Sequence, residues 1–334
     1  MAVDQWLQAP FTRDPVRRRT YPDDVYFREM AALLDGRDAR DNERTLGRST
    51  FVMFKPDAVV GRRIEPALDL LAGHGFEPLG ALEVRVDARV CRELWRYQIN
   101  AAPLAVIRAV DMILESGPPC LFVALHDTRG PQRTGRTAAE RLGEIKGSSK
   151  NRDTGGTSLR GALGCELMCL NFLHAPDDAA DMIRETGVLL PARRREEAWT
   201  MLEGEPSPGR TLDVLAAARR LCAAHPAHPL TPPPGSTSPA GADSAELLAR
   251  VDELAEDHGG LPLWDRIVLA AHLVDDLPSE GTALIGPPPG TRPNHPRASR
   301  STDAAPVSQG TRTSTTTEPP AHLTAPATAV TADQ

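Results

Sequence analysis

Residues 49–60, STFVMFKPDAVV, hold a short apolar run that ends at a lysine followed by a proline. The run 50–54 carries the aromatic and branched side chains typical of a buried strand. Lys55 places a positive charge at the end of that strand. The apolar residues within 64–71 then recur at helical spacing, before two glycines that suit a helix end. The stretch therefore predicts a strand and then a helix, with a cation where the strand ends.

The change from strand-like to helix-like patterns continues as far as residue 186. Further strands are expected at 76–86, 120–126 and 165–172. Helices are expected from Asp87 to about Tyr97, at 104–114, at 138–146 and from Pro176 to Thr186. Because strands and helices alternate, the sequence predicts an α/β or α+β fold with helices packed on a sheet.

Composition divides the chain into four segments. They are an N-terminal extension (1–48), a central domain (49–190), a helical extension with a Pro-rich linker (191–276) and a tail (277–334). Apolar spacing over 27–34 predicts an amphipathic helix in the first segment. The tail contains no aromatic residue and is rich in Pro, Thr, Ser and Ala, so we expect it to be disordered.

The helical extension contains one further amphipathic pattern. Asp243 and Glu246 resemble a capping box at a helix start. Leu247, Val251 and Leu254 follow as an apolar stripe. Such a stripe packs on the core of its own chain or binds a helix of a partner, and both interpretations stay open.

Charge and cysteine usage narrow the function classes. The formal net charge is −7, which makes nucleic-acid binding unlikely in spite of the basic runs PVRRR and ARRRE. No apolar run reaches the roughly 18 residues of a membrane helix, and the N-terminus has no signal-peptide pattern. The five cysteines form no C-x-x-C pair, which is typical of a reducing compartment. We therefore expect a cytoplasmic protein without a membrane partner.

His174 stands in LNFLHAPDD (170–178), between an apolar run and two acids. It can be a structural residue, a metal ligand or a nucleophile. The metal interpretation is weak, because no second His or Cys lies at ligand spacing from it. Its place at a strand-to-helix junction is more informative, since ligand chemistry gathers at strand ends in open sheets. Three other charged residues lie next to apolar runs: Lys55, Arg160 and Glu185. Taken singly, a charged residue in such a place is more often on the surface than in a functional site.

Several motifs in one order resemble the nucleoside diphosphate kinase family. Residues 49–60 resemble the first strand of that family and its Lys-Pro-Asp motif. ILESGPPCLFVALHD (113–127) resembles its Ser-Gly-Pro turn and third strand. GTSLRG (156–161) resembles its Gly-Thr-x-Arg-Gly element, and NFLHAPDD (171–178) resembles its Asn-x-x-His. The resemblance covers roughly 49–190 and implies a ferredoxin-like α/β sandwich, an antiparallel sheet with helices.

The resemblance also implies a chemistry and roles for residues. A phosphoryl group passes from a nucleoside triphosphate to His174 and then to a nucleoside diphosphate, with Glu185 orienting the ring. Lys55 and Arg160 neutralise the phosphoryl oxygens, and Asn171 contacts the sugar. Mg²⁺ arrives with the nucleotide rather than in a site of the protein, and the family commonly forms homo-oligomers.

Departures from the family pattern define an alternative. Ala175-Pro176-Asp177 replaces the usual Gly-Ser-Asp after the histidine. The second phosphate-binding arginine corresponds to Arg136 or Arg141, and the aromatic residue beside the base to Tyr97 or Trp95. The alternative is a catalytically weak or inactive nucleotide-binding or regulatory module with the same fold.

Overall fold

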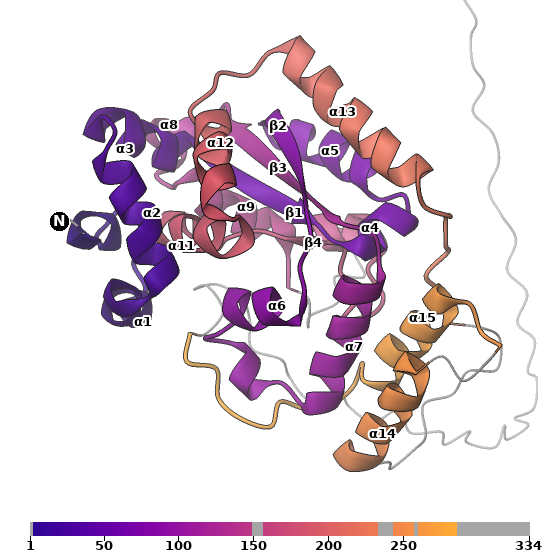
Figure 1. Cartoon of the computed structure of the whole chain (residues 1–334). Coiled ribbons are helices and arrows are strands. Elements are labelled where there is room, and N and C mark those ends of the chain that lie inside the picture. Colours follow the sequence, from indigo (N-terminus) through magenta and orange to yellow (C-terminus); the bar gives the residue numbers. More distant parts are fainter. Residues whose placement is uncertain (1–2, 149–155, 233–242, 257–259, 286–334) are drawn as a thin grey trace, which may run out of the picture. The chain divides into compact units, whose positions relative to one another are not determined.

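The computed structural model describes residues 3–148, 156–232, 243–256 and 260–285 (Figure 1). The described part of residues 1–294 belongs to one compact unit. The tail expected to be disordered lies outside the described residues, except for 277–285. The segment boundaries expected from composition stay predictions.

The described strands form one four-stranded sheet. It contains β1 (Ser49–Phe54), β2 (Phe76–Val84), β3 (Cys120–Asp127) and β4 (Leu173–His174), in the order β2-β3-β1-β4. Every described pair is antiparallel, and Val52 of β1 lies opposite Val123 of β3. This is the strand order of a ferredoxin-like fold, with helices inserted between β2 and β3, so the fold prediction is confirmed.

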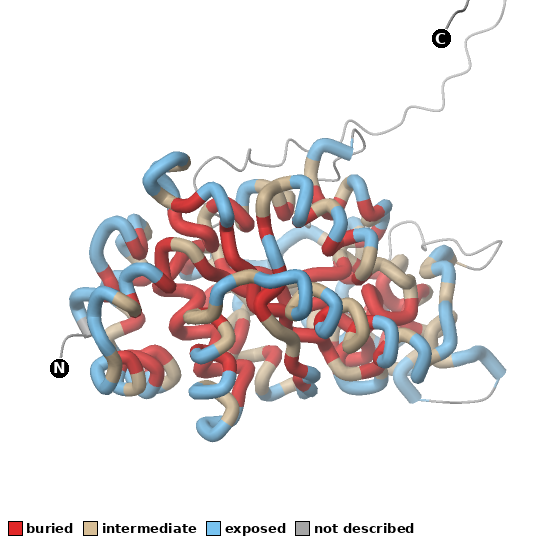
Figure 2. Tube along the Cα trace, turned by 90° about the horizontal axis from the view of Figure 1, so that it is seen from above, coloured by how far each residue is buried: buried red, intermediate tan, exposed pale blue. Residues whose placement is uncertain are grey.

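Both faces of the sheet are buried, because alternate side chains of a strand point to opposite faces. Phe51 stacks on Phe122 on one face, with ring centroids 4.5 Å apart. Val52 and Phe54 contribute to the core on the other face. Figure 2 shows this buried centre beneath an exposed periphery.

Helices cover each face. The first face packs against α2 (Val25–Asp35), α6 (Ala88–Leu94), α11 (Ala179–Leu189) and α12 (Ala192–Leu202). The second packs against α4 (Pro56–Val60), α5 (Ile64–Gly73), α9 (Ala138–Lys146), α10 (Leu159–Ala162) and α13 (Pro208–Ala223). The other described elements are η1 (Val3–Leu7), α1 (Pro15–Thr20), η2 (Tyr21–Asp23), α3 (Ala39–Arg48), η3 (Ile99–Ala101), α7 (Leu104–Ser116), α8 (Gly130–Thr134), α14 (Ser244–Ala255) and α15 (Leu263–Leu273).

The predicted helices at 27–34, 64–71, 104–114 and 138–146 are confirmed as α2, α5, α7 and α9. Asp87 caps α6 as expected, because its carboxylate accepts the Val90 N–H at 2.8 Å. The helix ends at Leu94, earlier than predicted, because the backbone of Trp95 leaves the helical region.

The predicted strand at 165–172 is wrong. Only Leu173 and His174 pair with β1, opposite Phe54 and Met53. Phe172 has a φ of 67°, a left-handed conformation that cannot continue a strand. The apolar side chains of 165–172 are therefore mostly buried in turns rather than in a ladder.

The predicted helix start at Pro176 is also wrong. The helix α11 begins at Ala179, and Asp178 is its N-cap. The Asp178 carboxylate accepts the Asp181 N–H at 2.8 Å. This side-chain bond satisfies a backbone donor that the first helical turn leaves without a partner.

Segments outside 49–190 share the same cores. Trp6, Tyr21, Phe27 and Leu46 belong to the core on the first face of the sheet. The stripe on α14 packs in a third core with α7 and α15, which supports the packing interpretation over a partner helix. Among the described residues, no helix combines the length and the apolar composition that crossing a membrane requires.

A close helix crossing yields a stability prediction. A Cβ added to Gly187 of α11 lies 2.7 Å from the Tyr26 carbonyl oxygen of α2, whereas nothing lies within 4 Å of a Cβ added to Gly73 of α5. Gly187→Ala should therefore lower the free energy of unfolding by about 1–3 kcal/mol. Gly73→Ala should leave it unchanged or raise it by up to about 1 kcal/mol. Chemical denaturation measures both, and equal stability of the two variants would contradict this account of the crossing.

Candidate active site

His174 lies on the edge strand β4 and contacts a buried acid. Its Nε2 is 2.8 Å from Oε2 of Glu185, which projects from α11. The two side chains are 13% and 4% exposed, so the ring reaches solvent while the carboxyl does not. The expected pairing of these residues, eleven apart in sequence, is present in the structure.

The contact determines which ring nitrogen carries a proton. Burial raises the pKa of Glu185 to about 7, and Asp181 acts in the same direction. Once ionised, the carboxylate accepts a hydrogen from Nε2–H. The lone pair of a neutral imidazole then lies on Nδ1. His174 is thus held as the tautomer in which Nδ1 can act as a nucleophile.

Of the two aromatic candidates, Trp95 is the one that contacts His174. The rings meet edge to face, with centroids 5.5 Å apart and planes at 83°. Tyr97 lies elsewhere: its hydroxyl donates to Asp24 at 3.1 Å and its ring packs on Tyr21. Trp95 thus lies beside the ring of His174, and Tyr97 packs against the N-terminal extension.

The Lys-Pro-Asp motif holds the strained residue that precedes β4. The Lys55 N–H donates to the Phe172 carbonyl, and the Phe172 N–H donates to Oδ2 of Asp57, both at 2.8 Å. A left-handed non-glycine residue costs about 1–3 kcal/mol and persists only where its surroundings impose it. Lys55 Nζ donates to the Cys169 carbonyl at 2.8 Å and lies 3.8 Å from Asp57 Oδ2.

Arg160 and Asn171 meet on the same segment. The buried Arg160 guanidinium donates to the carbonyls of Gly147 at 2.8 Å and Leu173 at 2.7 Å, and it lies 3.4 Å from Asn171 Oδ1. Burial lowers the pKa of Arg160, yet an arginine stays protonated at neutral pH. The structure therefore brings Lys55, Arg160 and Asn171 to the chain on one side of His174.

Lys146, at the end of α9, was not expected in the site. Its Nζ donates to the Ala175 carbonyl at 2.8 Å and to Oδ1 of Asp177 at 3.0 Å. Buried cations thus bind the carbonyls on both sides of His174, Arg160 at Leu173 and Lys146 at Ala175. A basic residue in the last helical turn is common for local reasons, so no distinctive sequence signal marks Lys146.

Arg136 and Arg141 are the two candidates for the second phosphate-binding arginine. The partners described for each lie outside the chain around His174. Arg136 forms an ion pair with Glu144 of α9. Arg141 forms a buried ion pair with Asp127 at the end of β3 and donates to the His74 carbonyl at 2.9 Å.

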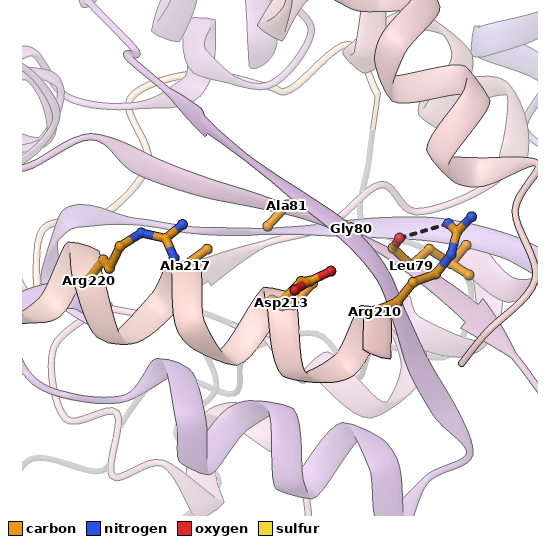
Figure 3. Close-up of a pocket in the computed structure, with 8 residues that line it drawn as sticks. Leu79, Gly80, Ala81, Arg210, Asp213, Ala217 and Arg220 are labelled. Atoms are coloured by element: carbon orange, nitrogen blue, oxygen red, sulfur yellow. Dashed lines mark hydrogen bonds between the residues drawn. The ribbon is translucent and has the colours of Figure 1, made fainter. Parts of the chain in front are cut away.

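A hollow of about 220 Å³ lies elsewhere, between β2 and α13 (Figure 3). The β2 residues Leu79, Gly80 and Ala81 line it on one side, and Arg210, Asp213 and Arg220 of α13 line it on the other. Arg210 donates to the Leu79 carbonyl at 2.9 Å. Because β2 and β4 are opposite edges of the sheet, this hollow is separate from His174.

The described ranges contain no group of three or more His, Cys, Asp or Glu side chains placed to hold a metal ion. Acidic residues do surround the site, but buried cations are their partners, as at Asp177.

No protein-family model and no curated protein matches the chain. Among solved structures, it is similar to a halophilic nucleoside diphosphate kinase from Halobacterium salinarum in complex with CDP. The identity is 21% over 39% of this chain and 78% of that chain, with a TM-score of 0.32. It is also similar to an NDP kinase from Pyrobaculum aerophilum, at 16% identity over 43% of this chain and 96% of that chain, with a TM-score of 0.34. At these values the ferredoxin-like fold rests on the strand order, not on the two similarities.

Proposed function

We propose that the chain transfers the γ-phosphoryl group of a nucleoside triphosphate to a nucleoside diphosphate through a phosphohistidine on His174. The observation that carries the proposal is the 2.8 Å contact between His174 Nε2 and Glu185. It leaves Nδ1 as the nucleophilic atom of a ring that is partly exposed. The resemblance of the Asn-x-x-His motif at 171–174, together with the spacing of eleven residues to Glu185, supports the same assignment.

The transfer takes place in two balanced steps. The Nδ1 lone pair attacks the γ-phosphorus in line while the bond from that phosphorus to the β-γ bridging oxygen breaks, and the nucleoside diphosphate leaves. The phosphorylated ring carries a positive charge, which the Glu185 carboxylate stabilises through Nε2–H. A β-phosphate oxygen of a second diphosphate then attacks the phosphorus, and Nδ1 leaves as the neutral ring.

Positive side chains supply the electrostatic part of the mechanism. Lys55 has one described hydrogen bond, to Cys169, whereas an ammonium has three donors. The Nε of Arg160 is buried and has no partner. In the proposal, their remaining donors stabilise the charge on the transferred oxygens, and Asn171 contacts the sugar. Arg136 and Arg141 stay predictions.

The proposal includes Mg²⁺ that enters with the nucleotide. This ion prefers oxygen ligands and keeps several waters. Lys55 and Arg160 carry nitrogen donors and a positive charge, so phosphate oxygens and water suit the ion better as ligands than these side chains do.

The alternative function is nucleotide binding or regulation without turnover. It is favoured by the burial of Lys55 and Arg160, which are 6% and 9% exposed and already donate to backbone carbonyls. The two functions differ in whether phosphate becomes covalently bound.

Covalent labelling tests the proposal directly. Incubation with γ-labelled ATP and Mg²⁺ should give acid-labile, base-stable label on the wild type and none on His174→Ala. The control is His225→Ala, because His225 follows α13 and its described contacts, with Cys222 and Arg62, are made by its backbone. Absence of label on the wild type would refute the transfer, and nucleotide binding without label would favour the alternative.

Glu185→Gln should separate activity from stability. The pKa of Glu185, about 7, lies above its ordinary value of 4.5, so the folded chain disfavours the ionised carboxyl. Its contribution to stability is present below about pH 4.5 and is lost as pH rises through about 7. The neutral amide avoids that loss, so the thermal midpoint at about pH 8 should not fall. The labelling rate at the same pH should fall by about 10²-fold.

The pH profile provides the control for this variant. Wild-type labelling should increase between about pH 6 and about pH 8, because the pKa of Glu185 is raised to about 7 and its ionised form is the one that orients the ring. If Glu185→Gln is labelled at about pH 8 as fast as the wild type, an orienting role of Glu185 toward the ring of His174 is ruled out.

A further inference from the structure

An arginine of the N-terminal extension binds the turn that follows His174. Arg17 of α1 is 3% exposed. Its guanidinium lies 3.1 Å from Asp178, 3.2 Å from Asp177 and 3.5 Å from Asp181. It therefore joins the turn after β4 to the first turn of α11.

Two neutral side chains of the same extension complete the contact. The Thr12 hydroxyl donates to Oδ2 of Asp178, and the Tyr21 hydroxyl donates to Oδ1 of Asp181, both at 2.6 Å. These bonds are buried, so they order the turn more firmly than exposed bonds would.

A second buried link reaches the residue beside Glu185. Arg184 Nε donates to Oδ2 of Asp24 at 2.7 Å, and the two side chains are 1% and 0% exposed. Asp24 is the N-cap of α2. The extension thus binds α11 immediately before Glu185 as well as at its first turn.

The balance of charge around His174 and Glu185 depends on Arg17. The charged groups that act on Glu185 are Asp181 on its own helix, Asp177 in the turn and His174 on β4. Arg17 is an ion-pair partner of both aspartates, and Lys146 from α9 is a second partner of Asp177. Without the guanidinium, buried carboxylates would repel one another and Glu185.

Two other neighbours of Arg17, Asp14 and Tyr21, carry no positive charge that could replace its guanidinium. Asp14, on the same side of the helix, lies 3.5 Å from the guanidinium, and Tyr21 is neutral because burial and Asp181 raise its pKa.

We propose that Arg17 is a positioning residue of the active site. It fixes the turn 175–178 and balances the charge around His174 and Glu185, so that residues 12–24 are part of the site. This inference rests on the proposed function, because positioning matters only if His174 reacts.

The test uses the full chain and compares Arg17→Met with Arg19→Met, because Arg19 is exposed on the same helix. The first readout is the NMR titration of the His174 ring, assigned by the signal that His174→Ala removes. Arg17 is an ion-pair partner of Asp177, whose charge acts on His174. Loss of the guanidinium should therefore move the midpoint upward by about half a unit to one unit. The second readout is the dependence of labelling on ATP concentration. In Arg17→Met the maximal labelling rate should fall about tenfold. The ATP concentration that gives half of the maximal rate should change by less than about twofold.

Arg17→Lys provides the conservative comparison. It keeps the charge but cannot bind several carboxylates with a planar fork. The midpoint should therefore stay near the wild-type value while the maximal rate lies between those of the wild type and Arg17→Met. Arg19→Met should match the wild type in both readouts.

Several results would overturn the inference. One is a titration midpoint of the His174 ring in Arg17→Met equal to that of the wild type, whatever the labelling rate of the variant. Another is that Arg19→Met changes the midpoint and the labelling rate as much as Arg17→Met does. If Arg17→Met does not fold, Arg17→Lys decides, since a wild-type labelling rate in that variant rejects the role. If the wild type takes no label, the proposed function fails, while the ring titration still tests the link between Arg17 and His174.

Discussion

The site depends on buried cations that bind backbone carbonyls of an irregular segment. Residues 165–178 contain only two residues of strand, so most of their carbonyls lack a ladder partner. Lys55, Arg160 and Lys146 donate to the carbonyls of residues 169, 173 and 175. Two of these residues, Lys55 and Arg160, are also the ones that the proposed function places on the transferred phosphoryl oxygens. Removal of any one of them would alter both the shape and the charge of the site.

Both extensions support this segment. On the N-terminal side of the segment, Leu167, Cys169 and Leu170 pack in one core with α7, α14 and α15, and the Met168 N–H donates to Asp275 at 2.7 Å. On the other side, α1 and η2 bind the turn and α11 through Arg17 and Tyr21. Parts of the chain that composition sets apart from the central domain therefore stabilise the two flanks of one short strand.

The sequence predicts the regular parts well because local patterns determine them. Alternating or continuous apolar residues mark β1 to β3, and helical spacing marks α2, α5 and α7. The prediction fails at 165–172 because the left-handed Phe172 depends on Asp57 and Lys55, far away in the sequence. Arg17 gave no signal either, since a basic run such as RRR is usually exposed, and the aspartates that Arg17 binds around the turn after His174 lie 160 or more residues away.

The short β4 also affects how the sheet can meet other chains. An edge strand offers unpaired N–H and C=O groups that can template the addition of a foreign strand, and a very short edge removes most of them. The opposite edge, β2, is protected in another way. It contains Pro78 and an irregularity between Pro78 and Gly80, and the side chains of Arg194 and Arg210 donate to its Glu83 and Leu79 carbonyls. Neither of these two edges therefore favours strand pairing with another chain.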